Sequence, residues 1–113
     1  MSRKELAKAE PLYRQAIVIY SSAQSPEHLN TGIARTKLGR SLLRQGRFAE
    51  AALESLAGYE IVSKQSDPAV SFLKNARKDL VAAYDSLGQP DKAARFRAEL
   101  ADTLPKTTAV SQK

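Results

Sequence analysis

The sequence contains no cysteine and only one histidine, and these two features exclude several kinds of site. Without thiols, neither a disulfide framework nor a thiolate metal centre can form. With His28 as the only imidazole, metal ligands would have to be carboxylates, and no run of Asp and Glu has calcium-site spacing. We therefore expect neither a metal nor another cofactor.

Long apolar runs are also missing. No stretch approaches the roughly 20 apolar residues that a membrane-spanning helix needs. The N-terminal residues 1–5 are not followed by the apolar core of a signal peptide. These features predict a cytoplasmic protein that does not enter a membrane. No segment alternates with a period of two residues, so no β-sheet is expected.

Groups suited to catalysis are scarce. His28 lies in a predicted first helical turn without an evident nucleophile or orienting partner, so we interpret it as a cap or surface residue. Glu50 and Glu54 are neighbours on one helix, whereas glycosidase chemistry needs two carboxylates across a cleft. The sequence therefore predicts a protein that is not an enzyme.

What the chain does contain is a repeat with a period of 42 residues. Four residues return one period later: Pro26, Leu38, Gly46 and Ala51 correspond to Pro68, Leu80, Gly88 and Ala93. A partial upstream copy is marked by Ala9, which lies 42 residues before Ala51. A fixed period of about 20–50 residues is typical of stacked-repeat proteins, whose units bury their apolar faces against each other. This organisation favours a recognition surface over a catalytic pocket.

Apolar residues recur with helical spacing, and turn signals divide the chain into five predicted helices. The first lies within residues 4–23, where Pro11 predicts either a start near residue 9 or a kink. Ser25 and Pro26 predict the N-cap and first turn of the second helix, which runs to about Gln45 before Gly46. The other boundaries are marked in the same way: about Phe48 to Lys64, Asp67-Pro68 to Gly88, and Gln89-Pro90 to Pro105.

These helices predict one domain over residues 1–104, followed by a flexible polar tail over residues 105–113. Short connections predict that successive helices lie antiparallel. Gly39 and Gly58 lie in the middle of helices, where glycine costs about 1 kcal/mol relative to alanine, so we expect two backbones to approach closely there. Tyr20, Tyr59 and Tyr84 are predicted to pack in the core or between helices.

Leu38-Gly39, the run Gly46-Arg47-Phe48-Ala49-Glu50-Ala51 and the small Gly58 resemble a tetratricopeptide repeat (TPR). The period is longer than the usual value of about 34 residues and is similar to that of the kinesin-light-chain type. The segment 9–16 resembles the start of the second helix of such a repeat, which implies that Pro11 falls in its first turn. The resemblance covers about residues 9–101. It implies an all-α, antiparallel helix-hairpin α-solenoid with five helices, or roughly two and a half repeats.

The last copy, residues 80–94, resembles the end of TPR arrays attached to bacterial serine/threonine protein kinases. No Gly-rich loop, catalytic Asp loop or magnesium-binding Asp motif is present in the sequence. The resemblance therefore implies a non-catalytic C-terminal part of such a protein.

A basic stripe on the second predicted helix is the best candidate for a site. Lys37, Arg40, Arg44 and Arg47 are spaced to share one helix face with Ile33, and no carboxylate lies between His28 and Ala49. In the TPR family the exposed face of each first helix lines a concave groove that binds peptides. The resemblance implies a partner-binding groove of Ile33, Lys37, Arg40, Arg44 and Arg47, continued one period later by Asn75 and Lys78.

Arginine forks suit carboxylates and phosphates, so an acidic protein or peptide is the expected partner. A solvated helix face is the commoner origin of such a stripe, and contact with a nucleic-acid backbone is a third interpretation. Nucleic acid is disfavoured because the stripe has no interleaved aromatic residues. The net charge of +6 favours anionic partners without choosing among them. If the groove is used, Arg40→Glu with Arg44→Glu should abolish partner capture with little loss of stability.

The first predicted helix has apolar residues on more than one side, including Leu12, Val18 and Ile19. These three predict an exposed apolar patch, and such patches mark interfaces. We expect upstream repeats of a longer protein, or a second copy in a homodimer, to cover it. The rival function is therefore a regulatory or dimerisation segment of a larger enzyme such as a bacterial protein kinase.

Overall fold

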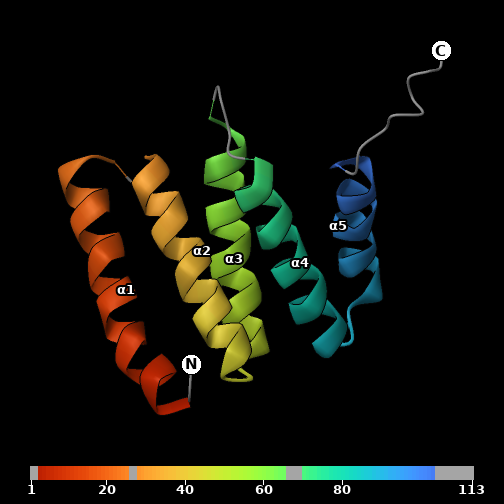
Figure 1. Ribbon diagram of the computed structural model, residues 1–113, viewed down its shortest axis with the longest axis horizontal. Coiled ribbons are helices and arrows are strands. Elements are labelled where there is room, and N and C mark those ends of the chain that lie inside the picture. Colours follow the sequence, from red (N-terminus) through yellow and green to blue (C-terminus); the bar gives the residue numbers. More distant parts are fainter. Residues whose placement is uncertain (1–2, 26–27, 66–69, 104–113) are drawn as a thin grey trace.

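Five antiparallel α-helices make up the computed structural model, which describes residues 3–25, 28–65 and 70–103. The helices are α1 (Arg3–Ala23), α2 (Leu29–Arg44), α3 (Phe48–Ser63), α4 (Val70–Ser86) and α5 (Pro90–Thr103). They stand side by side in a row in which each helix runs opposite to the one before it (Figure 1). Each helix contacts the next, and α2 also contacts α4. The predicted all-α array of TPR-like helix hairpins is confirmed.

Two glycines end α2 and α4 in the same way, as predicted. Gly46 and Gly88 have φ angles of 79° and 70°, in the left-handed region that favours glycine. After α2, the amide of Arg47 donates to the Leu42 carbonyl at 2.9 Å and that of Gly46 donates to Leu43 at 3.0 Å. The same pair of bonds follows α4: Gln89 to Tyr84 at 2.9 Å and Gly88 to Asp85 at 3.0 Å. Both turns are therefore Schellman motifs, and the 42-residue period extends to the backbone hydrogen bonds.

The first helix begins earlier than its proline predicts. Because α1 starts at Arg3 and continues through Pro11, both the predicted start near residue 9 and the placement of Pro11 in a first turn are wrong. The cause is Leu6, whose side chain is only 4% exposed and whose carbonyl accepts a hydrogen bond from Ser41 Oγ at 3.4 Å. Packing of this extra turn against α2 outweighs the one backbone hydrogen bond that proline cannot make.

The N-cap of α2 is His28, so the prediction of Ser25 is wrong. The His28 Nδ1 atom accepts a hydrogen bond from the Asn30 amide at 3.1 Å, which is the bond of an N-cap side chain. The interpretation of His28 as a cap is thereby confirmed. The Ser25 carbonyl instead accepts from Thr31 Oγ1 at 2.9 Å. The predicted start of the fourth helix at residues 67–68 and the predicted tail at residues 105–113 lie outside the described residues.

The two mid-helix glycines lie where α2 and α3 approach each other, as predicted. A Cβ atom on Gly39 would lie 2.1 Å from Ser55 Oγ and 2.9 Å from the Ser55 amide nitrogen. A Cβ atom on Gly58 would lie 2.3 Å from Thr36 Oγ1 and 2.6 Å from the Gly32 carbonyl oxygen. These distances leave no room for a side chain larger than hydrogen, so glycine allows the backbones to pack.

Two apolar clusters form the core. One joins α1, α2 and α3 and consists of Ile17, Ala34, Leu38, Leu42 and Ala51. The other joins α3, α4 and α5 around Phe96, whose ring meets Tyr59 edge-on at 5.7 Å and stacks on Tyr84 at 6.0 Å between centroids. The core positions of these two tyrosines are confirmed, but that of Tyr20 is wrong. Tyr20 is 36% exposed because the backbone of α1 lies beside that of only one other described helix, α2.

Candidate functional site

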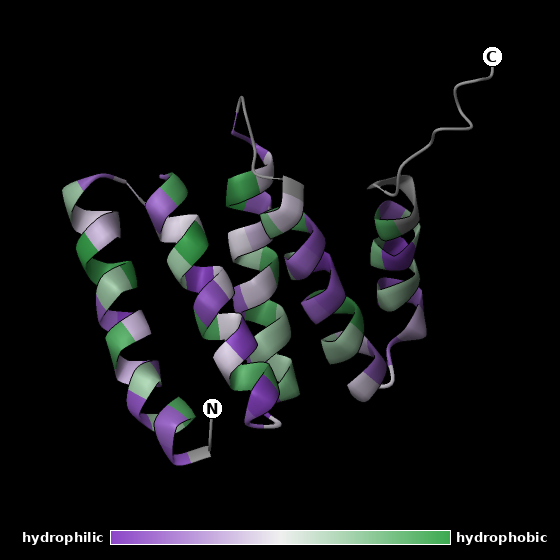
Figure 2. Cartoon of the chain, viewed as in Figure 1, coloured by the Kyte–Doolittle hydropathy of each residue, from purple (hydrophilic) through white to green (hydrophobic). Residues whose placement is uncertain are grey.

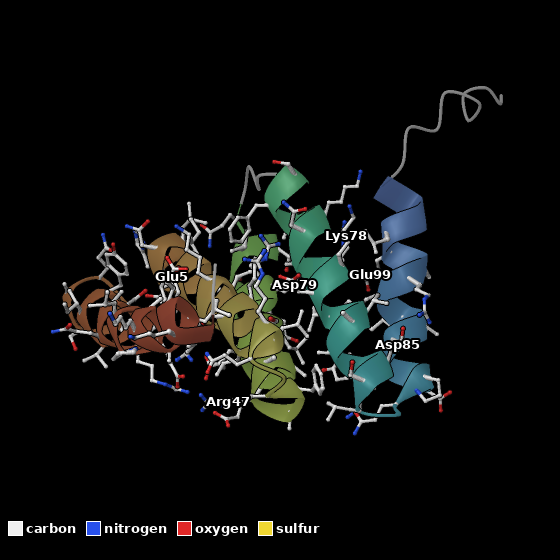
Figure 3. The ribbon with its side chains drawn as sticks, turned by 60° about the horizontal axis from the view of Figure 1, so that its bottom comes forward. Glu5, Arg47, Lys78, Asp79, Asp85 and Glu99 are labelled. Carbon is white, nitrogen blue, oxygen red and sulfur yellow. The ribbon has the colours of Figure 1, made fainter. Side chains whose placement is uncertain are left out.

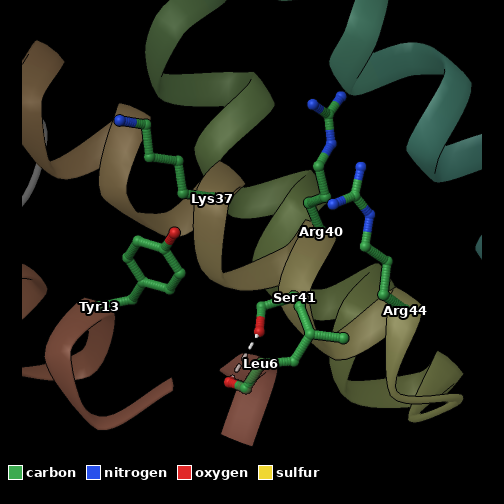
Figure 4. Close-up of a pocket in the computed structure, with 6 residues that line it drawn as sticks. All are labelled: Leu6, Tyr13, Lys37, Arg40, Ser41 and Arg44. Carbon is green, nitrogen blue, oxygen red and sulfur yellow. Dashed lines mark hydrogen bonds between the residues drawn. The ribbon is translucent and has the colours of Figure 1, made fainter. Parts of the chain in front are cut away.

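The basic residues of α2 lie along three adjacent hollows that share Lys37. The first measures about 210 Å³ and separates α1 from the C-terminal half of α2; it is lined by Leu6, Tyr13, Lys37, Arg40, Ser41 and Arg44 (Figure 4). The second measures about 240 Å³, lies towards α4 and is lined by Thr36, Lys37, Arg40, Phe72 and Asn75. The third measures about 350 Å³ and is lined by Tyr13, Ala16, Tyr20, Asn30, Ile33, Ala34 and Lys37. We name the surface formed by Ile33, Lys37, Arg40, Arg44 and Asn75 the α2 groove.

The central arginine of this groove already has a partner. Arg40 Nε donates to Asp79 Oδ2 on α4 at 3.0 Å, and the Asp79 side chain is largely buried. Burial raises the pKa of Asp79, while the hydrogen bond from Arg40 and the charges of Arg40 and Arg44 act in the opposite direction. Arg40→Glu would set two carboxylates against each other here. We therefore expect the Arg40→Glu/Arg44→Glu variant to lose stability, and a binding test is better made with substitutions at other residues.

Lys37 and Arg44 differ from Arg40 because no ion pair or hydrogen bond joins either side chain to another described residue. Both residues are exposed. The guanidinium group of Arg44 lies beside that of Arg40, whereas Lys37 extends in the other direction (Figure 4). Lys37 and Arg44 are thus two cations at separate positions along one groove, and both are available to bind anions. The Arg40–Asp79 ion pair connects this groove to α4.

Arg47, the last residue of the predicted stripe, lies at the turn between α2 and α3. Its guanidinium group donates to Glu10 at 2.5 Å and to Glu50 at 2.7 Å. Arg14 pairs with the same two carboxylates at 3.0 Å and 3.4 Å. Figure 3 shows Arg47 apart from Lys78 and Asp79, which lie on α4. Arg47 therefore belongs to a network that joins α1 to the start of α3, and Lys78 is an exposed residue outside the three hollows.

This network should make stability depend on pH. Burial raises the pKa of Glu10, but hydrogen bonds from Arg47 and Arg14 outweigh it and leave the pKa below the ordinary value of 4.5. A carboxylate with a lowered folded pKa contributes stability above its unfolded pKa, and this contribution is lost as the pH falls through the folded pKa. Glu10→Gln should therefore lose less stability than the wild type between about pH 5 and pH 3.

Urea unfolding at a series of pH values tests this expectation, with Glu60→Gln as the matched control because Glu60 is exposed and outside the network. The raised pKa of Asp79 makes stability depend on pH in the opposite sense. Asp79 is present in all three proteins, so its contribution cancels when their pH dependences are compared. Identical pH dependence in Glu10→Gln and the wild type would show that the network contributes nothing to acid sensitivity.

A model of the tetratricopeptide repeat matches residues 1–61, which is more than half of the chain. The chain belongs to the tetratricopeptide repeat family. The match spans α1, α2 and α3 as far as Ile61, and therefore covers the helix that carries the basic residues and nearly all of its hairpin partner. The comparison with curated proteins found no significant match, and neither did the comparison with solved structures.

TPR domains are in general scaffolds for protein–protein interaction and carry no catalytic activity. Within residues 3–25, 28–65 and 70–103 of this TPR protein, no group of three or more His, Asp and Glu side chains could hold a metal ion. None of its described helices is both long enough and apolar enough to cross a membrane.

One network in this TPR array was missed by the sequence analysis. The Tyr59 hydroxyl donates to Glu99 Oε1 at 2.6 Å and accepts from Arg77 Nε at 2.9 Å, so it joins α3, α4 and α5. The Arg77 guanidinium also lies over the Tyr59 ring, 5.4 Å from its centroid. Because the partners lie 18 and 40 residues from Tyr59, no spacing within one helix could reveal the network. It fixes α5 to the TPR hairpins.

The outer side of α1 carries the predicted apolar patch of Leu12, Val18 and Ile19. All three side chains are exposed, by 65%, 64% and 54%. Strongly hydrophobic segments recur along α1 in Figure 2. The sequence from residue 15 to residue 25 contains no charged residue, so the helix has only uncharged side chains after Arg14. The predicted exposure of the patch is confirmed.

Proposed function

We propose that this TPR array is an interaction scaffold whose α2 groove binds an acidic peptide or an acidic segment of a protein. The observation that carries the proposal is that Lys37 and Arg44 lie at hollows without an ion-pair partner among the described residues. Most other arginines of the described part are already paired with carboxylates, as Arg14, Arg35, Arg40 and Arg47 are.

The spacing of the two cations indicates what the partner presents. Lys37 and Arg44 are seven residues apart on α2, so their Cα atoms are separated by about 10 Å along the axis. A partner covers about 10 Å in three residues of extended chain or in seven residues of helix. A segment with two carboxylates at this separation therefore fits, with the arginine donating two hydrogen bonds to one carboxylate and the lysine acting as a point charge. A nucleic-acid backbone is the weaker candidate, because bases stack on aromatic residues that alternate with the cations. Here the aromatic residues Tyr13 and Phe72 lie on α1 and α4, at the sides of the α2 groove.

Capture of partners from a lysate of the source cells tests the proposal. The wild type is compared with Lys37→Glu/Arg44→Glu, and Lys4→Glu/Lys64→Glu is the matched control because it changes the net charge equally at exposed residues outside the groove. We expect partners to be retained by the wild type and the control, and reduced at least about tenfold by the groove variant, since attraction becomes repulsion at two positions.

Retained partners are then competed with an acidic synthetic peptide and with duplex DNA. Displacement by the peptide supports the proposal, whereas displacement by the duplex alone would favour a nucleic-acid function. Equal retention by all three proteins would contradict a role of the basic residues.

Equal retention would instead favour the second candidate function, a regulatory or dimerisation segment of a larger enzyme. The exposed patch of Leu12, Val18 and Ile19 is the observation that favours it. Upstream repeats, or a second copy in a homodimer, would then cover α1. The kinesin-light-chain type of repeat and the likeness of residues 80–94 to kinase-attached TPR arrays belong to this second proposal, as does a cytoplasmic location.

A further inference from the structure

A hollow of about 350 Å³ lies between α1 and α2. Its lining residues precede by 42 positions those of a second surface, on α3 and α4, against which α2 packs. The hollow is lined by Tyr13, Ala16, Tyr20, Asn30, Ile33, Ala34 and Lys37. The residues 42 positions later are Ser55, Gly58, Val62, Phe72, Asn75, Ala76 and Asp79 on α3 and α4. We name the first surface the α1–α2 hollow and compare it with its filled counterpart.

In the counterpart, α2 lies against these residues. A Cβ atom on Gly39 of α2 would meet Ser55, and a Cβ atom on Gly58 would meet Gly32 and Thr36 of α2. Arg40 of α2 pairs with Asp79 of α4 at 3.0 Å. The counterpart of the α1–α2 hollow is therefore a surface that holds a helix lying antiparallel to α3 and beside α4.

The α1–α2 hollow lacks such a helix among the described residues. The backbone of α3 lies beside α2 on one side and α4 on the other, whereas the backbone of α1 lies beside α2 alone. The difference appears in side-chain exposure: Val62 is 1% exposed in the filled surface, but its counterpart Tyr20 is 36% exposed. The α1–α2 hollow thus lies at the position of a helix-binding surface, with Tyr13 and Ala16 in place of Ser55 and Gly58, and no described helix fills it.

Charge distinguishes the two surfaces. Where α4 has Asp79, which receives Arg40, α2 has Lys37, which has no ion pair with another described residue. A helix in the α1–α2 hollow would therefore need a carboxylate at the position where α2 carries Arg40. An arginine there would meet Lys37 as a like charge.

The flank of the hollow differs as well. In the filled surface Arg35 of α2 pairs with Glu54 of α3 at 2.9 Å. The counterpart of Glu54 is Leu12, which is exposed and adjoins Ala16 on the next turn of α1. Ile19, one turn further on, extends the same apolar flank. An occupant would therefore need an apolar side chain where α2 carries Arg35.

We propose that the α1–α2 hollow docks an amphipathic helix of a partner protein, antiparallel to α1, with a carboxylate facing Lys37 and an apolar residue five positions earlier facing Leu12. The proposal rests on the proposed function in taking the partner to be acidic. It goes further because it assigns that partner a helical form, a direction and a position on the fold.

Two synthetic peptides derived from residues 29–45 test the docking. Both carry Arg35→Leu, and only the second also carries Arg40→Glu. Binding to the full chain is measured by titration, with the site located from backbone amide shifts in NMR spectra. We expect the second peptide to bind about fivefold more tightly than the first, because repulsion from Lys37 becomes attraction. The shifts should concentrate at Tyr13, Ala16, Ile33 and Lys37.

The Lys37→Glu protein should reverse this preference, and Lys64→Glu should leave it unchanged because Lys64 is exposed at the end of α3, outside the hollow. Equal affinity of the two peptides, no binding, or shifts confined to α4 and α5 would overturn the proposal. Shifts of the hollow residues with protein concentration alone would also overturn it, since a second copy would then fill the hollow. Because the peptides are supplied, these outcomes do not depend on whether the lysate contains an acidic partner of the α2 groove.

Discussion

Replacing Gly39 with alanine should lower the free energy of unfolding by about 2–3 kcal/mol, although alanine is the better helix former. At an exposed helical position the same change would stabilise the helix by about 1 kcal/mol. Here the new Cβ atom would lie 2.1 Å from Ser55 Oγ and 2.9 Å from the Ser55 amide nitrogen. The hydroxyl can rotate away, but the backbone cannot, so α2 and α3 would have to separate and lose contacts along the whole hairpin.

Urea unfolding followed by circular dichroism measures this effect. Ser55→Ala removes the hydroxyl, so the Gly39→Ala/Ser55→Ala double variant should recover part of the loss but not all of it. The remaining part belongs to the backbone contact, and the double-mutant cycle separates the two. A Gly39→Ala protein as stable as the wild type would show that the hairpin adjusts without cost and that close approach does not require glycine there.

Phe96→Ala should cost about 3–5 kcal/mol, which is a large part of the stability of a domain of this size. The ring is 2% exposed and lies between Tyr59 and Tyr84, so truncation leaves a cavity where α3, α4 and α5 meet. Because the backbone of α5 lies beside that of α4 alone and Phe96 supplies its ring contact with Tyr59 of α3, we expect α5 to detach first.

Denaturant unfolding and the near-ultraviolet circular dichroism of the tyrosines report this loss, since both neighbouring rings are tyrosines. Leu53→Ala is the control, because Leu53 is 69% exposed and its truncation should change stability by less than about 0.5 kcal/mol. Similar losses in the two variants would contradict the central position of Phe96 in the core.

Most helix ends could be predicted because they depend on a few neighbouring residues. Gly46 and Gly88 are needed for a positive φ, and Pro90 suits a first helical turn, so each marks its boundary from sequence alone. The start of α1 could not be predicted, because it depends on Leu6 packing against α2 and on its carbonyl accepting from Ser41, 35 residues away. At Pro11, the loss of one backbone hydrogen bond is outweighed by this packing.

The candidate site could likewise be predicted only in part from the sequence. Residues spaced by three or four positions on one helix share a face, so the grouping of Lys37, Arg40 and Arg44 follows from sequence. The pairing of Arg40 with Asp79 does not, since it spans 39 residues and depends on how α4 packs beside α2. The sequence therefore predicts where the cations lie, but not which of them already have a partner.

The turns at Gly46 and Gly88 have the same backbone geometry, so the fold repeats every 42 residues. An in-frame duplication of 42 residues between the turns would add one more hairpin and keep every helix in register, because the backbone geometry at both junctions is the same. An insertion of one or two residues within a helix would instead rotate each following side chain by about 100° per added residue and turn core-facing positions outwards. A gene for such a chain can therefore lengthen in whole hairpins, each of which extends the row by a fixed step while the end helices stay as they are.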